Sequence, residues 1–169
     1  ILAIIRKLGV NGGIGFAYEF AGDVFKNMSM EERLTVCNMA IEGGARMGYI
    51  NPDQTAFDYL KGRLYSPQGA DWDKAVAFWK TMATDPKAKF ADEVMMDGGS
   101  LEPHVTFGIT PAQSVGVGEK LPSAQDLPAD QRGSLEEAYR YMGFKPGMSV
   151  TDIPVNVCFI GSCTNGRLS

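Results

Sequence analysis

The stretch Val155-Asn156-Val157-Cys158-Phe159-Ile160 runs directly into Gly161-Ser162-Cys163-Thr164-Asn165-Gly166. The first six residues are mostly apolar and rich in β-branched and aromatic types, which predicts a buried strand. In the loop that follows, two glycines permit tight backbone geometry, and small polar residues surround one thiol. Ligands in α/β folds bind beyond the carboxyl ends of strands, so this loop is where a site is expected.

Helices and short strands alternate along the rest of the chain. Apolar spacing predicts helices over residues 1–8, 29–47, 51–60, 71–82 and 134–141, and strands over residues 16–20, 90–96 and 155–160. Ser29 and Glu32 form a capping-box pattern that starts the second helix, and Asn51 before Pro52 caps the third. This alternation predicts a mixed α/β fold.

Prolines 103, 111, 122 and 128 crowd one segment, which predicts a connector over the surface. We therefore expect an α/β domain over residues 1–105, a connector over 106–133, and the start of the next α/β domain over 134–169. The chain begins without Met inside an apolar run and stops just after the loop at 161–166. We expect it to be a piece of a longer protein.

Composition excludes several partners. The chain has 16 Lys and Arg against 20 Asp and Glu, and these charges are interspersed, which argues against nucleic acid and a polybasic membrane contact. No apolar run approaches the roughly 20 residues of a membrane-spanning helix. Its three cysteines form no even disulfide framework, which favours a reduced, cytoplasmic protein.

Cys163 is the strongest chemical candidate, because backbone N–H groups at a turn favour the thiolate that a nucleophile or metal ligand requires. A small turn residue is the alternative, and spacing does not decide between them. Cys37 and Cys158 are expected to be buried apolar residues. A catalytic pair of Cys163 and His104 is not favoured, because no Asp or Glu lies at a sequence spacing typical of a third catalytic residue.

Asn38 and Glu42 stand four residues apart and would share one face of the helix predicted over residues 29–47. They are either two polar groups that point into a cleft or part of a solvated face. The glycines between Gly9 and Gly15 follow a helix pattern and lack a Gly-Lys-Ser/Thr ending, so a nucleotide loop is not expected.

Five motifs resemble, in order, those of the aconitase superfamily, and within it the large subunits of 3-isopropylmalate dehydratases. They are Gly12-Gly13-x-Gly15, residues 28–45, Pro52-Asp53-Gln54-Thr55, Lys61-Gly62-Arg63 and residues 159–167. The similarity covers essentially the whole chain. Several long motifs at compatible separations are far more specific than any one of them.

The resemblance implies an aconitase-like fold, a three-layer α/β/α arrangement with a mixed sheet. It also implies a hydro-lyase that isomerises 2-isopropylmalate to 3-isopropylmalate by dehydration and rehydration in leucine biosynthesis. The family uses a 4Fe–4S cluster held by three cysteines, in which one open iron acts as a Lewis acid. Cys163 matches the first ligand, with Asn165 beside it, and Asn38 and Glu42 match catalytic residues next to the cluster.

The resemblance also implies what this chain lacks. The other two cluster cysteines of the family would follow Ser169, and its early His and Asp motifs would precede Ile1. The implied partners are the rest of the large subunit, a small subunit and a hydroxy-acid substrate, so the isolated chain is expected to be inactive. Thr106-Phe107-Gly108-Ile109 departs from the Thr-Trp-Gly-Thr pattern of isopropylmalate dehydratases, which leaves aconitase or homoaconitase as alternative enzymes. For the chain as it stands, the other alternative is a non-catalytic module that associates with further segments or subunits.

Overall fold

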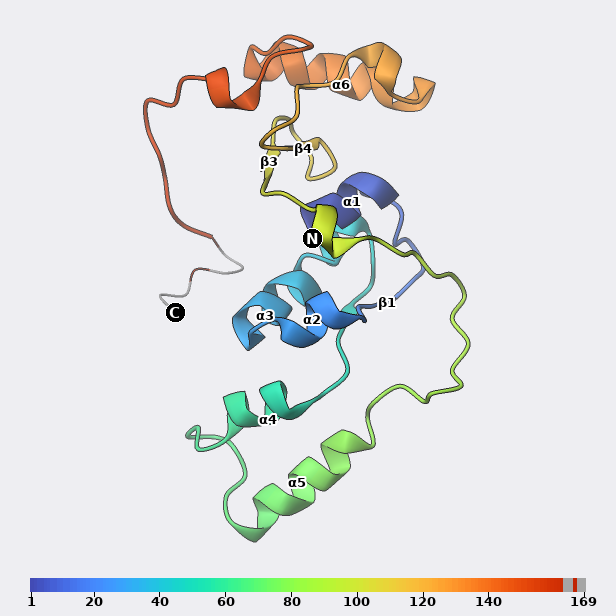
Figure 1. Ribbon diagram of the computed structural model, residues 1–169, viewed down its shortest axis with the longest axis vertical. Helices are drawn as coiled ribbons and strands as arrows, with labels where there is room; N and C mark the ends of the chain where they lie inside the picture. Colours follow the sequence, from blue (N-terminus) through green and yellow to red (C-terminus); the bar gives the residue numbers. More distant parts are fainter. Residues whose placement is uncertain (163–165, 167–169) are drawn as a thin grey trace.

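The structure is a computed structural model that describes residues 1–162 and 166 (Figure 1). Its α-helices are α1 (Leu2–Leu8), α2 (Asp23–Asn27), α3 (Met30–Asn38), α4 (Gln54–Leu60), α5 (Ala70–Lys80) and α6 (Ala129–Met142). Short 3-10 turns are η1 (Ile41–Gly43), η2 (Gly98–Ser100), η3 (Ala124–Asp126) and η4 (Val150–Asp152). The molecule is elongated, with α6 at one end, α5 at the other and α1 between them.

Two small sheets accompany these helices. Strand β1 (Tyr18–Glu19) pairs in parallel with β2 (Gly48–Tyr49), and β3 (His104–Thr106) pairs antiparallel with β4 (Ser114–Gly116). The predicted mixed α/β class is therefore confirmed. Because each sheet formed by residues 1–162 has two strands, the three-layer arrangement implied by the resemblance stays a prediction for a longer chain.

The first core lies where α3 packs on β2. Its buried side chains are Phe20, Val36, Ala40 and Ala45. Close approach of the two backbones depends on Gly48, because a Cβ built there would lie 2.7 Å from the Cα of Cys37. A side chain at this position would push α3 away from the strand and open the core.

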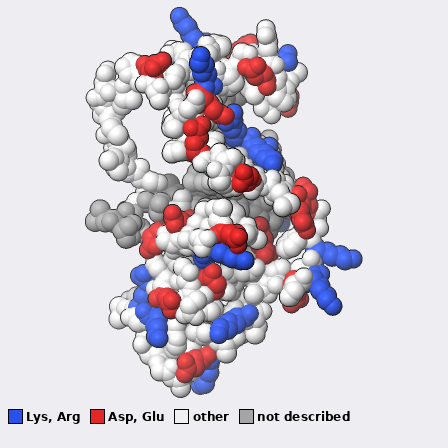
Figure 2. Space-filling view, viewed as in Figure 1, with Lys and Arg blue, Asp and Glu red and all other residues white. Residues whose placement is uncertain are grey.

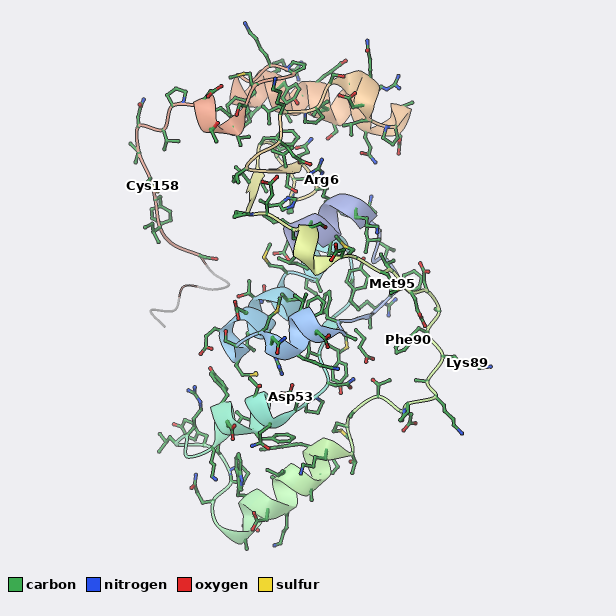
Figure 3. All side chains as sticks on the ribbon, viewed as in Figure 1. Arg6, Asp53, Lys89, Phe90, Met95 and Cys158 are labelled. Atoms are coloured by element: carbon green, nitrogen blue, oxygen red, sulfur yellow. The ribbon has the colours of Figure 1, made fainter. Side chains whose placement is uncertain are left out.

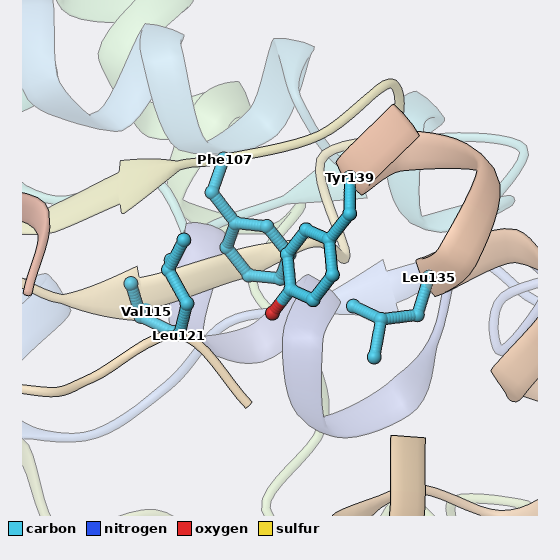
Figure 4. Close-up of a cluster of buried hydrophobic side chains, with 5 residues drawn as sticks. All are labelled: Phe107, Val115, Leu121, Leu135 and Tyr139. Atoms are coloured by element: carbon cyan, nitrogen blue, oxygen red, sulfur yellow. The ribbon is translucent and has the colours of Figure 1, made fainter. Parts of the chain in front are cut away.

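The second core joins α6 to the β3–β4 hairpin (Figure 4). Its buried side chains are Phe107, Val115, Leu121, Leu135 and Tyr139. The Tyr139 hydroxyl donates to the Pro122 carbonyl at 2.5 Å, and burial raises the pKa of Tyr139 to about 12. The segment expected to be a surface connector, residues 106–133, thus contains β4, the end of β3 and three of the five buried side chains of this core. The predicted domain limits themselves stay a prediction.

Arg33 is the charged side chain that ties α2, α3 and α4 together. It is 3% exposed, and its guanidinium donates to both carboxylate oxygens of Asp53 at 2.6 and 2.8 Å. The same side chain donates to the carbonyls of Lys26 at 2.7 Å and Met28 at 3.2 Å. Asp53 also accepts from the Ala56 N–H at 3.3 Å, which caps α4.

Several predicted element limits are wrong. The helix expected over residues 29–47 ends at Asn38 and is followed by the 3-10 turn η1. Gly44, with a left-handed φ of 85°, ends η1, and the chain then forms β2. The cap of α4 is Asp53 and not Asn51, and α6 begins at Ala129, five residues before the predicted capping box at Ser134.

The strands expected over residues 90–96 and 155–160 are absent from the described chain. Figure 3 shows Phe90 and Met95 on one extended segment and Cys158 on another. Val157 is 84% and Ile160 93% exposed, so the apolar run near the C-terminus is not buried. A strand needs a neighbour to satisfy its backbone groups, and residues 1–162 supply none to either segment.

We expect Gly48→Ala to lower the free energy of unfolding by about 2 kcal/mol, because its Cβ would collide with the backbone of Cys37. Gly133 is the matched control, since it lies inside α6 with nothing within 4 Å of an added Cβ. Gly133→Ala should raise stability by about 0.5–1 kcal/mol through helix propensity. Urea denaturation of both variants checks this, and equal effects would contradict the packing described at Gly48.

Arg33→Met should lower the free energy of unfolding by about 2 kcal/mol at pH 7, because it leaves a partly exposed Asp53 without its partner. Lys74→Met is the control, since its ion pair with Asp71 is exposed on α5. That change should cost less than about 0.5 kcal/mol. If Arg33→Met lowered the free energy of unfolding no more than Lys74→Met does, the structural role assigned to Arg33 would be contradicted.

The Arg33–Asp53 pair also predicts a pH dependence. Hydrogen bonding from Arg33, more than any other cause, holds the pKa of Asp53 below its usual 3.8. The stabilisation is complete above the unfolded pKa and is lost as the pH falls through the folded pKa. Urea denaturation from pH 6 to pH 2 should therefore show a steeper acid loss for the wild type than for Asp53→Asn, and parallel curves would contradict this.

Candidate functional site

Asn38 and Glu42 lie at the C-terminal end of α3. Asn38 is the last residue of α3, and Glu42 is the middle residue of η1. Met39 and Ala40 between them keep right-handed helical dihedral angles, so Glu42 follows Asn38 by about one turn. Both residues are exposed to solvent. The predicted shared helix is wrong, but the relation of one turn between the two polar groups is retained.

A second loop fixes the turn that carries Glu42. The Gly13 N–H donates to the Gly43 carbonyl at 2.8 Å, directly after Glu42. A Cβ on Gly13 would lie 2.4 Å from the Ala45 nitrogen, and one on Gly44 would lie 2.7 Å from the Val10 carbonyl oxygen. Glycine at these positions therefore allows the two loops to pack closely. This packing explains the Gly-rich sequence near the N-terminus without invoking a bound phosphate.

The start of α3 is held as the sequence predicts. The Ser29 N–H donates to a Glu32 carboxylate oxygen at 2.7 Å, and the Glu32 N–H donates to the Ser29 hydroxyl at 3.4 Å. The backbone N–H of Ser29 lowers the pKa of Glu32. This confirmed capping box sets where α3 begins and so fixes how many turns separate Ser29 from Asn38.

The cysteines divide differently from the prediction. Cys37 packs half-buried against the first core, and burial raises its pKa, so the expected packing role is confirmed and a thiolate is disfavoured. Cys158 was expected to be buried but is exposed. Cys163 and Asn165, the predicted cofactor-binding residues, lie outside the described residues.

No metal site forms among residues 1–162. No three His, Cys, Asp or Glu side chains of this part lie where they could hold a metal ion together. A 4Fe–4S cluster held by cysteines needs several thiolates, whereas Cys37 is in a core and Cys158 is on an extended segment. The described residues by themselves therefore do not fit the cluster, and the catalytic roles of Asn38 and Glu42 stay a prediction.

Two ion pairs and one cavity-lining histidine could not be predicted from local sequence patterns. Arg33 and Asp53 are 20 positions apart, and Arg6 contacts Glu119 across 113 positions. His104 was considered only as a partner of Cys163, yet it lines a cavity with Arg6. Pairs so far apart in the chain are visible only once the fold is known.

The visible surface carries no segregated charge. Figure 2 shows acidic and basic side chains mixed over the described part of this face. None of the helices in the described part of the chain is long and apolar enough to cross a membrane.

Comparison with known proteins gives one consistent result. Large subunits of 3-isopropylmalate dehydratase match all 169 residues, with 59% identity in Crocosphaera subtropica, 58% in Gloeobacter violaceus and 57% in Synechococcus sp. (strain JA-3-3Ab). The chain spans about 36% of the length of these relatives.

The profile described as Aconitase family (aconitate hydratase) matches residues 1–169. This match extends over the whole chain and includes both loops around Glu42 and the segment that carries Cys163. On this evidence, the chain belongs to the aconitase family.

Proposed function

We propose that this chain is part of the large subunit of a 3-isopropylmalate dehydratase, a hydro-lyase of leucine biosynthesis. The observation that carries the proposal is identity of 57–59% over the full chain with large subunits of that name. The reaction would isomerise 2-isopropylmalate to 3-isopropylmalate by removing and returning water. A cytoplasmic location and a small-subunit partner belong to the same proposal.

In this proposal Glu42 supplies a carboxylate that holds or moves a proton at the substrate hydroxyl, and Asn38 supplies an amide that orients the same group. Their exposure at the end of α3 supports this, because the pair is accessible to a substrate or to another part of the parent protein. The bond from Gly13 to Gly43 holds the Glu42 backbone in place, so the carboxylate is presented from a fixed turn.

The 4Fe–4S cluster belongs to the parent protein in this proposal. When bound, it supplies Lewis-acid activation of the hydroxyl that leaves. Cys163 is the residue of this chain that would act as one ligand, with Asn165 beside it. Further ligands would come from elsewhere in the parent protein.

Activity should depend on Glu42 in the complete enzyme. With the parent large subunit and its small subunit, Glu42→Gln should lower kcat for 2-isopropylmalate by about 100-fold or more, since proton transfer would be lost. Glu136→Gln, on the exposed face of α6, is the matched control and should leave kcat unchanged. If the wild type turned over citrate or homocitrate faster than 2-isopropylmalate, the proposal that 2-isopropylmalate is the substrate would be wrong.

The isolated chain should hold no stable cluster. Iron and acid-labile sulfide, measured after anaerobic reconstitution, should stay well below one cluster per chain, because Cys163 alone cannot replace three thiolate ligands. Reconstituted parent large subunit is the positive control. A stoichiometric cluster on the 169-residue chain would contradict the ligand assignment.

A further inference from the structure

A surface cavity of about 360 Å³ lies between α1 and residues from the segment 96–119, which contains η2 and the β3–β4 hairpin. Charged side chains of both signs line it: Arg6 and Lys7 from α1, and Glu102 and Glu119 from the facing segment. Figure 3 places Arg6 between α1 and the β3–β4 hairpin. The cavity is separate from the end of α3 and does not enter the proposed reaction.

The charged groups in this cavity are held in position. Arg6 donates to Glu119 at 2.5 Å, and the same Glu119 oxygen accepts from the Gly116 N–H at 2.9 Å. Glu102 accepts from the Gly118 N–H at 3.0 Å. Lys7 donates to the Met95 carbonyl at 3.0 Å. Each of these side chains keeps further capacity, since a guanidinium has five N–H donors, an ammonium three and a carboxylate about four acceptor sites.

Among the described residues, His104 contributes a polar atom without a hydrogen-bond partner to the wall of this cavity. This atom is Nδ1, which is buried. A buried polar atom that lacks a partner costs free energy, so native structures normally supply one. This nitrogen has almost no accessible surface, so it can accept from a bound molecule once the His104 ring turns toward the cavity that it lines.

The lining selects the chemistry of that molecule. Two cationic and two anionic side chains cancel, so neither a simple anion nor a simple cation is favoured, whereas a ligand with both charges meets a partner for each. Leu101, Met96 and Ala3 add apolar surface to the same wall. We infer that the cavity binds a small zwitterion of the α-amino-acid type with a short apolar side chain.

In this arrangement the ligand carboxylate faces Arg6 and Lys7. Its ammonium lies near the carboxylates of Glu102 and Glu119 and donates to Nδ1 of His104 after the imidazole ring has turned toward the cavity. Removing either charge of the ligand would leave one side of the lining without a counterpart, which is the basis of the test.

The test uses L-norvaline, with butylamine and pentanoate as analogues that lack one charged group each. His104 is the single histidine of the chain, so its ring signals in NMR spectra report on the cavity alone. L-norvaline should shift these signals saturably with a Kd on the order of 1 mM, the range that ligand efficiency gives for so small a molecule. Each analogue should bind about tenfold more weakly or worse.

Variants identify the site. Lys7→Gln leaves the Arg6–Glu119 pair intact and should weaken L-norvaline binding by about tenfold in the same NMR titration. His104→Phe removes the Nδ1 acceptor and should do the same by calorimetry, and Lys74→Gln on α5 should change nothing. Circular dichroism confirms that each variant is folded. Absence of saturable shifts up to about 20 mM, equal binding of pentanoate or butylamine, or unchanged binding by folded Lys7→Gln would overturn the inference.

Discussion

The buried guanidinium of Arg33 is the constraint on which the N-terminal half depends. A charge at 3% exposure needs partners for its donors, and here they come from Asp53 and from the carbonyls that end α2. Satisfying one side chain therefore fixes α2, α3 and α4 relative to one another. Because Asn38 ends α3, the position of the candidate site follows from the same interaction.

Glycines impose the complementary constraint. Gly48 allows β2 to approach α3, and Gly13 and Gly44 allow two loops to approach each other around Glu42. A buried charge sets which elements must meet, and the missing side chains set how closely they can do so. The buried Arg33 and these glycines together fix the positions of α3 and η1, which carry the exposed residues Asn38 and Glu42.

The two faces of α1 (Leu2–Leu8) have different surroundings. Ile5 is buried, and its side chain lies near Gly43 in the turn that carries Glu42. Arg6 and Lys7 face the hairpin side instead, where they line the charged cavity. One short helix thus packs against the candidate site with its apolar face and contributes to the proposed zwitterion site with its basic one.

The sequence by itself determined the local features: the mixed α/β class, the capping box at Ser29 and Glu32, and the spacing of Asn38 and Glu42. These rest on interactions within one turn of the chain, which sequence spacing describes directly. The tertiary structure alone decided that α3 stops at Asn38, that Cys158 is exposed and that Arg6 meets Glu119. Strand formation, burial and long-range ion pairs depend on neighbours far along the chain, and local patterns carry no information about them.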